Sequence, residues 1–156
     1  MQITFQRELQ GDVINDSRKL WKAHWEETEG YRSGVGYQPD EGQLFKLDEL
    51  GQLRIYTARG ENNILLGHLC YITHISRHTS KPSATEDYFY VIPEARGSGI
   101  AMRLLKFAIN DLRQNGYTEI GMSEKITNPI GPLLKRVGFK HVANFYVLAD
   151  DGSAKE

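Results

Sequence analysis

The sequence predicts a mixed α/β fold with an antiparallel front half and one parallel crossover. Residues 88–112 read as a strand, a glycine-containing turn and an amphipathic helix. Segments that alternate with a period of two precede this stretch, and another strand follows it, which makes a β-α-β unit. We therefore expect one mixed sheet with flanking helices.

The N-terminal third of the chain predicts one strand and two helices. Residues 2–9 alternate enough for a short strand, and apolar side chains recur at helical spacing over residues 13–29. Glycines, a proline and aromatic residues mark residues 30–42 as a surface loop on the substrate side. A second, short helix is expected over residues 43–50, because a glycine follows it.

The middle of the chain predicts three consecutive antiparallel strands. Residues 53–58 alternate with a period of two, residues 60–63 have turn chemistry, and residues 64–76 form a longer strand. A polar turn then leads into the strand that ends at Ile92. That strand stops there because Pro93 has no backbone N–H to donate to a neighbour.

The turn after this strand brings two glycines to the start of a helix. Gly97 and Gly99 leave the backbone uncovered where the unpaired N–H groups and the positive end of the helix dipole attract an anion. The sequence therefore predicts a phosphate-binding turn. The helix has an apolar face at helical spacing, made by Ile100, Leu104, Leu105, Ala108, Ile109 and Leu112.

The C-terminal third completes the predicted sheet. A strand is expected over residues 117–122, a helix over residues 131–137 that Gly138 ends, and a last strand over residues 142–148. Residues 1–149 are expected to form a single domain. The polar residues 150–156 predict a disordered tail.

Composition narrows the partners and the compartment. The chain has 156 residues and a formal net charge of -1, so no overall basic surface predicts nucleic acid or membrane binding. Cys70 is the single cysteine, which excludes an intrachain disulfide. The N-terminal residues lack the apolar run of a signal peptide, and no stretch has membrane-spanning length. A cytoplasmic protein is expected.

With these residues in view, the chain resembles the GNAT family of acyl-CoA N-acetyltransferases, over nearly its whole length. Its closest likeness is to small single-domain members from bacteria and bacteriophages, which would place a phage-encoded copy in the host cytoplasm. Asn128 and the Gly138 and Phe139 pair match the family further downstream. The family's turn signature and its lead-in are matched by Val91, Ile92, Pro93, Arg96, Gly97, Ser98, Gly99, Ile100 and Ala101.

Other glycine-rich turns fit less well. A Walker P-loop is excluded because no Gly-Lys-Ser/Thr follows. A dinucleotide fingerprint would need a small residue at Met102 and an early parallel strand before the turn. A glycine turn that only allows tight strand-to-helix packing is the remaining structural alternative.

The resemblance implies a mostly antiparallel sheet of roughly six to seven strands and an enzyme that transfers an acetyl group from acetyl-CoA directly to a primary amine. It implies that the amides of residues 96–101 bind the coenzyme pyrophosphate, and that Arg96 orients the loop or touches phosphate. Tyr90, Val91 and Ile92 would line the pantetheine arm, with the Val91 N–H donating to the thioester carbonyl. Asn128 would contact the coenzyme.

A direct transfer needs a base that takes a proton from the attacking ammonium. Glu86 and Asp87 are the carboxylates that enter the same strand, and strict alternation points them to opposite faces. We favour Asp87, because alternation places it on the face of Phe89 and Val91. Glu86 is kept as the alternative.

The family's usual general acid is a tyrosine on the fourth helix, and this chain has Leu134 at that position. Ser123, Tyr146 or water are the candidates to protonate the leaving thiolate, and a thiol pKa near 8.5 also allows it to leave unassisted. The replacement motivates a second reading, in which the protein binds acyl-CoA or a protein partner without turnover. A homodimer is kept as an option because dimers are common among relatives.

Histidines could in principle mark a metal site or the acceptor pocket. His68 and His74 share a strand face, but at about 3.3 Å per residue they lie roughly 20 Å apart, so no metal is predicted. His24 lies near Trp21 and Trp25 on the first helix, where core packing is favoured over a pocket border. The sequence carries no recognisable code for the acceptor.

Overall fold

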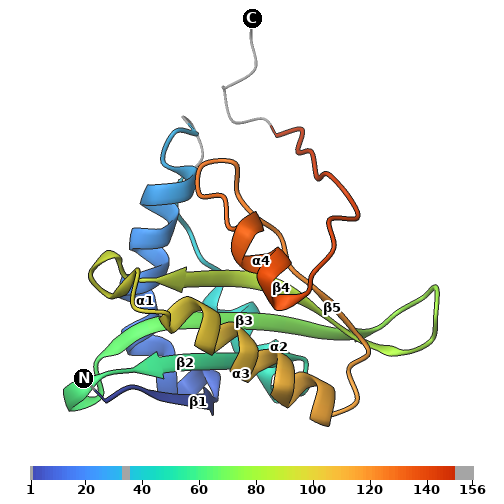
Figure 1. Ribbon diagram of the computed structural model, residues 1–156, viewed down its shortest axis with the longest axis horizontal. Coiled ribbons are helices and arrows are strands. Elements are labelled where there is room, and N and C mark those ends of the chain that lie inside the picture. Colours follow the sequence, from blue (N-terminus) through green and yellow to red (C-terminus); the bar gives the residue numbers. More distant parts are fainter. Residues whose placement is uncertain (1, 33–35, 150–156) are drawn as a thin grey trace, which may run out of the picture.

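The computed structural model describes residues 2–32 and 36–149 as one sheet covered by helices on both faces (Figure 1). The predicted tail at 150–156 and residues 33–35 of the predicted surface loop lie outside the described residues. The elements, in chain order, are β1 (Thr4–Glu8), α1 (Gln10–Glu29), α2 (Glu41–Glu49), β2 (Leu53–Arg59), η1 (Glu61–Asn63), β3 (Leu65–Ile75), β4 (Pro82–Val91), η2 (Pro93–Ala95), α3 (Ile100–Gln114), β5 (Glu119–Gly121) and α4 (Gly131–Val137).

The sheet has the order β1-β2-β3-β4-β5 in the described part of the chain. Strands β1 to β4 pair antiparallel with their sequence neighbours, and β5 pairs parallel to β4 after the α3 crossover. This confirms the predicted mixed α/β class with an antiparallel front half. It also places β1 and β5 at the two edges of the sheet.

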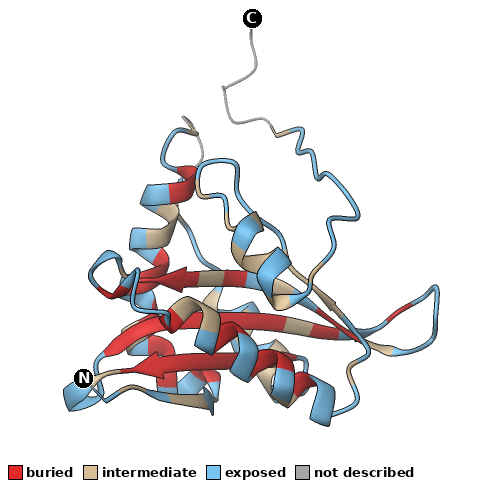
Figure 2. Ribbon diagram, viewed as in Figure 1, coloured by how far each residue is buried: buried red, intermediate tan, exposed pale blue. Residues whose placement is uncertain are grey.

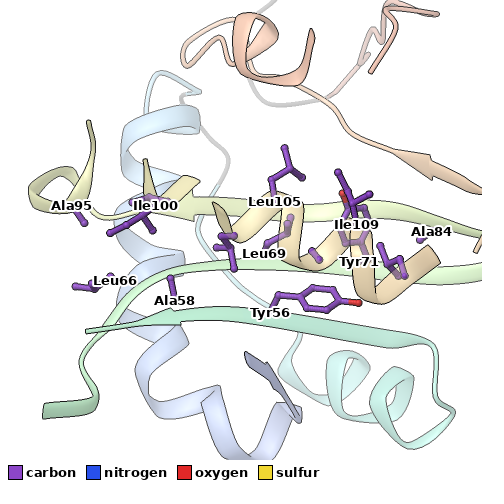
Figure 3. Close-up of a cluster of buried hydrophobic side chains, with 14 residues drawn as sticks. Tyr56, Ala58, Leu66, Leu69, Tyr71, Ala84, Ala95, Ile100, Leu105 and Ile109 are labelled. Atoms are coloured by element: carbon purple, nitrogen blue, oxygen red, sulfur yellow. The ribbon is translucent and has the colours of Figure 1, made fainter. Parts of the chain in front are cut away.

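The core on one face lies between the sheet and α3, and Figure 3 shows its side chains. All six apolar residues predicted for this helix face are buried. Leu104, Leu105 and Leu112 have no exposed surface and pack against Tyr56, Leu69 and Tyr71 of the central strands. Each fully buried leucine stabilises the fold by roughly 1.5–3 kcal/mol, so this helix is firmly attached to the sheet.

A second core lies on the opposite face, between the sheet and the helices α1 and α2. Val13, Leu20 and Trp21 of α1 are buried against Ile55 and Tyr88 of the strands. The two helices contact one another and the middle strands on this side. Tyr88 and Tyr90 therefore face α1, whereas Phe89 and Val91 face α3.

The predicted last strand is wrong, and so is a sheet of six to seven strands. Residues 142–148 form no strand, and Figure 2 shows this segment exposed throughout. Strand-like side chains are not sufficient for a strand, because the backbone needs a neighbour with free N–H and C=O groups. The neighbour here, β5, has only three residues.

None of the helices in residues 2–32 and 36–149 has both the length and the apolar character that crossing a bilayer needs.

Candidate functional site

The glycine turn presents a row of free backbone N–H groups. Gly97 and Gly99 have φ angles of +78° and +79°, a conformation that residues with a Cβ rarely adopt. In the described residues, the amides from Gly97 to Met102 donate to no backbone carbonyl, and the first such bond of α3 comes from Arg103 to Gly99. Six consecutive free donors at a helix start form an anion-binding site.

Space in front of this row is open. A Cβ placed on Gly97 or Gly99 would meet no atom of the protein within 4 Å. The glycines are therefore required by their backbone angles, and the uncovered surface is available to a ligand. A coenzyme pyrophosphate fits this donor set, because it supplies acceptor oxygens and negative charge to N–H groups that otherwise have no partner.

The Arg96 side chain holds the turn in place. Its Nε donates to the Val91 carbonyl at 2.9 Å, and its two terminal nitrogens donate to the Glu27 carboxylate at 2.8 Å each. The guanidinium lies 5.2 Å from the centre of the Tyr90 ring, and the Tyr90 hydroxyl also donates to Glu27. Arg96 therefore joins β4, the turn and α1.

Strand β4 has a free edge beside the turn. It pairs with β5 only over residues 83–85, so the rest of β4 has no strand partner on that side in the described chain. On the other side, the Ile92 N–H donates to Leu66 of β3. Successive amides of a strand point to opposite sides, so the Val91 N–H points to the free edge.

A β-bulge separates the two candidate bases. In the pairing of β3 with β4, Cys70 opposes Tyr88 and the next residue, Tyr71, opposes Glu86, which leaves Asp87 without a partner. The extra residue breaks the alternation on which we based the shared face of Asp87 with Val91. That part of the expectation is wrong: Asp87 lies on the side of Tyr88 and α1.

Glu86 and Asp87 consequently have different surroundings. The Glu86 carboxylate accepts from the Ser123 hydroxyl at 3.0 Å, toward the loop after β5. Asp87 makes no hydrogen bond or ion pair among the described residues and lines a cavity of about 470 Å³. Asp87 is exposed to solvent, and partial desolvation by the surrounding protein raises the pKa of its carboxyl. Burial also raises the pKa of Glu86, and the Ser123 hydrogen bonds partly oppose this.

The cavity lies between α1, α2, the loop before α2 and the strands β3 and β4. Aromatic residues from three of these elements line it, namely Trp21, Trp25, Tyr37 and Tyr88. His24 also lines it and stacks on Tyr90 at 5.0 Å, so the pocket border that we ranked second is where this histidine lies. Burial lowers the pKa of His24, which keeps its ring neutral at pH 7.

A second hollow, of about 480 Å³, lies at the opposite edge of the sheet, where β1 and the start of α1 line it. It contains no aromatic side chain and none of the residues of β4 or the glycine turn. We therefore place the candidate acceptor site in the aromatic cavity.

The residues considered as general acids for the leaving thiolate do not lie close together. Leu134 is half-buried and packs against the core under α3. Ser123 is hydrogen bonded to Glu86, and Tyr146 lies in the exposed C-terminal segment with 86% of its surface accessible. None of these side chains lines the aromatic cavity.

The loop before α4 is tied to the end of α1. Asn128 lies in a turn with Lys125, three residues before α4 begins rather than at its first residue. Thr127 donates to the Thr28 carbonyl at 2.9 Å, and Lys125 pairs with Glu29 at 2.5 Å. The last turn of α1 therefore contacts both sides of the gap between β4 and β5.

Sequence reasoning missed Glu27, which anchors Arg96. The two residues are 69 positions apart, and Glu27 lies in a helix with two other glutamates, Glu26 and Glu29, and no distinguishing spacing. A general rule offers the one available signal: a buried or partly buried arginine near a binding loop needs a carboxylate partner.

Comparison with known proteins places this geometry in a family. The model of the acetyltransferase (GNAT) family matches residues 17–139. The chain belongs to the GNAT family. The matched range includes the glycine turn, both candidate bases, Asn128 and Leu134. The assignment of the fold and of the N-acetyltransferase class is therefore supported over most of the chain. No curated protein matches the sequence.

Solved structures of acetyltransferases share the fold at low sequence identity. A ribosomal-protein-alanine N-acetyltransferase from Brucella melitensis biovar Abortus 2308 has a TM-score of 0.74 at 15% identity, covering 96% of this chain and 99% of its own. An aminoglycoside acetyltransferase from an uncultured soil metagenomic sample, in complex with sisomicin, has a TM-score of 0.72 at 18% identity, covering 95% of this chain and 97% of its own. A predicted acetyltransferase with acetyl-CoA from Clostridium acetobutylicum has a TM-score of 0.71 at 16% identity, covering 95% of this chain and 96% of its own.

Proposed function

We propose that this GNAT protein is an acetyl-CoA-dependent N-acetyltransferase that acts by direct transfer on a primary amine. The observation that carries the proposal is the row of free amides from Gly97 to Met102 beside the free edge of β4. Acetyl-CoA supplies an acetyl group activated as a thioester. The fold alone does not name the acceptor, because its solved neighbours include enzymes named for ribosomal-protein alanine and for aminoglycosides.

In this proposal, the turn and β4 bind and orient the coenzyme. The amides of Gly97, Ser98, Gly99, Ile100 and Ala101 hold the pyrophosphate, and Arg96 keeps the turn attached to β4. Tyr90, Val91 and Ile92 line the arm, and Asn128 contacts it from the loop before α4. The Val91 N–H donates to the carbonyl oxygen at the reacting end, where negative charge develops.

The proposed base is Asp87, and Glu86 is the alternative. A raised pKa brings a carboxylate closer to the pKa of the amine proton that it must accept, which improves a general base. Asp87 and Val91 are separated by roughly 13 Å of strand at about 3.3 Å per residue, so the proton reaches Asp87 through water in the cavity. With Leu134 at the usual acid position, the thiolate takes its proton from water or Ser123.

The second candidate function is acyl-CoA or protein binding without turnover. Leu134 favours it, because this side chain has no proton to give and packs in the core. Thiol release in the presence of acetyl-CoA and a panel of amines separates the two functions. Enzyme activity predicts amine-dependent release, whereas a binding module predicts coenzyme affinity with no release.

Calorimetry with acetyl-CoA and free CoA tests the coenzyme site. Gly99→Asp is expected to weaken binding at least about tenfold, because a carboxylate facing a pyrophosphate costs more than about 1.4 kcal/mol. Gly51→Asp is the matched control: Gly51 also has a positive φ, of +70°, and open space around it, but follows α2. Equal affinity of the two variants for CoA, or no CoA binding by the native protein, would overturn the proposal.

We further propose a cytoplasmic location and a homodimer. The single cysteine, which is buried and unpaired, supports the first. The exposed apolar segment after α4 supports the second.

A further inference from the structure

The aromatic cavity beside Asp87 indicates the class of acceptor. Resting on the proposed function, we propose that the acceptor is a small primary amine carried on an apolar, ring-containing body.

The walls are made by two aromatic contacts that join different elements. Trp21 of α1 meets Tyr88 of β4 edge to face, with ring centres 5.8 Å apart. One helical turn later, Trp25 meets Tyr37 of the loop before α2 at 6.2 Å. Leu44 and Ile72 add apolar surface from α2 and β3. Such walls favour a flat apolar group, and their ring faces also attract an ammonium.

Most charged side chains of the cavity already have partners. Glu29 pairs with Lys125, and the Asp40 carboxylate accepts the Gln43 backbone N–H at 2.9 Å as the cap of α2. Asp87 is the one charged group lining the cavity that has no hydrogen bond or ion pair among residues 2–32 and 36–149. An amine bound in the cavity therefore has a single free carboxylate to receive its proton, through the water that joins the reacting end near Val91 to Asp87.

The free polar groups of the cavity lie mainly at the edges of its aromatic rings. Beyond Asp87, the unpartnered polar groups of the described lining are carried largely by the aromatic side chains themselves. They are the indole N–H groups of Trp21 and Trp25, the hydroxyls of Tyr37 and Tyr88, the ring of His24 and the amides of Gln38 and Gln43. A sugar amine would present hydroxyls rather than apolar surface to the ring faces, so it would gain less from these walls. An amine on a ring places apolar surface against them. A volume of about 470 Å³ suits a small molecule of this kind.

Tryptophan fluorescence offers a direct test, because both tryptophans of the chain, Trp21 and Trp25, line this cavity. Titration with phenylethylamine, with and without saturating CoA, is expected to give a saturable fluorescence change, and glucosamine is not. Trp25→Ala is expected to weaken phenylethylamine binding at least about tenfold. Phe45→Ala, at a 38% exposed aromatic on α2 outside the cavity, should leave it unchanged.

Steady-state turnover with acetyl-CoA provides the second arm. Phenylethylamine is expected to have a kcat/KM at least about tenfold above those of glucosamine, an aminoglycoside and an alanine-first peptide. Higher kcat/KM for any of these three, or no saturable binding of phenylethylamine, would overturn the inference while leaving the transferase function in place. Failure of the function itself is recognised separately, by the absence of CoA binding in calorimetry.

Discussion

At the scale of single residues, Asp87 combines three properties that a structural carboxylate rarely has together. It is the extra residue of a β-bulge, it has no partner among the described residues, and its surroundings raise its pKa. Bulges and unpaired groups with raised pKa values are common at functional sites, because they are unfavourable for folding alone. Replacing Asp87 should therefore lower the activity while stabilising the fold.

Asp87→Asn is expected to lower kcat about 100-fold and to raise the melting temperature at pH 7 to 8. The folded-state pKa of Asp87 lies above its ordinary value of 3.8, so the folded protein loses stability as pH rises through that pKa. The stability gain of the variant should therefore disappear as pH falls toward 3.8. Thermal melts and rate profiles from pH 4 to 9 measure both effects.

Glu86→Gln is the control for this prediction. Glu86 also has a raised pKa, but it accepts a hydrogen bond from Ser123 on the other side of β4. Its replacement is expected to leave kcat within a few-fold of the native value. If Glu86→Gln loses activity and Asp87→Asn does not, Glu86 rather than Asp87 is the base.

Glu27 is the second residue whose role is specific. Because it neutralises Arg96 at the edge of the glycine turn, Glu27→Gln is expected to strengthen CoA binding several-fold at low salt. The pair is partly exposed, at 39% and 31%, so stability should change by no more than about 1 kcal/mol.

Glu41→Gln is a matched control for Glu27→Gln. Glu41 forms the same two-point contact with Arg18, at 2.7 and 2.8 Å, on the surface between α1 and α2. Calorimetry at two salt concentrations should show tighter CoA binding for Glu27→Gln alone. Equal effects from both variants would mean that general surface charge, rather than the contact with Arg96, sets the affinity.

At the scale of elements, the edge strand β1 is attached by a largely buried arginine. Arg59 of β2 is 2% exposed and binds Glu8 of β1 through two nitrogens, Asp16 of α1 and the Asn63 carbonyl. Burial alone would raise the pKa of Glu8, but the hydrogen bonds from Arg59 and Thr57 outweigh it and lower the pKa. This cluster joins three elements at the start of the fold.

Arg59→Ala is therefore expected to lower the free energy of unfolding by about 3–5 kcal/mol, because it leaves the Glu8 carboxylate buried without its cation. Urea denaturation measures this loss, and Arg18→Ala, on an exposed pair, should change the free energy of unfolding far less. The Glu8 contribution is present above its unfolded-state pKa and is lost as pH falls through the lowered folded-state pKa. A cost below about 1 kcal/mol for Arg59→Ala would contradict this account.

The elements that the sequence predicted correctly are those that local patterns determine. The buried face of α3 follows from helical periodicity, and the glycine turn from the backbone angles that Gly97 and Gly99 permit. The face of Asp87 was wrong because one inserted residue reverses alternation, and nothing local marks where a bulge occurs. Glu27 was missed because its partner is 69 residues away, and contacts at that separation depend on the complete fold.

At the scale of the whole molecule, the segment after α4 is the most unusual surface. Five large apolar side chains within residues 142–148 are 67–98% exposed. Figure 2 shows the segment running beyond the body of the protein, on the side of the sheet where β5 is the edge strand. Exposed apolar residues at this density next to an open sheet edge favour association with another surface.

We expect this segment to join two copies of the chain by pairing with the edge of β5. Analytical ultracentrifugation of the full chain should show a dimer at micromolar concentration. A chain ending at Lys140 should sediment as a monomer and melt at nearly the same temperature under dilute conditions, since no side chain of residues 142–148 belongs to either core. Phe145→Ser with Leu148→Ser should weaken the dimer without shortening the chain. A monomeric full chain, or an unchanged dimer after truncation, would show that the segment does not hold two copies together.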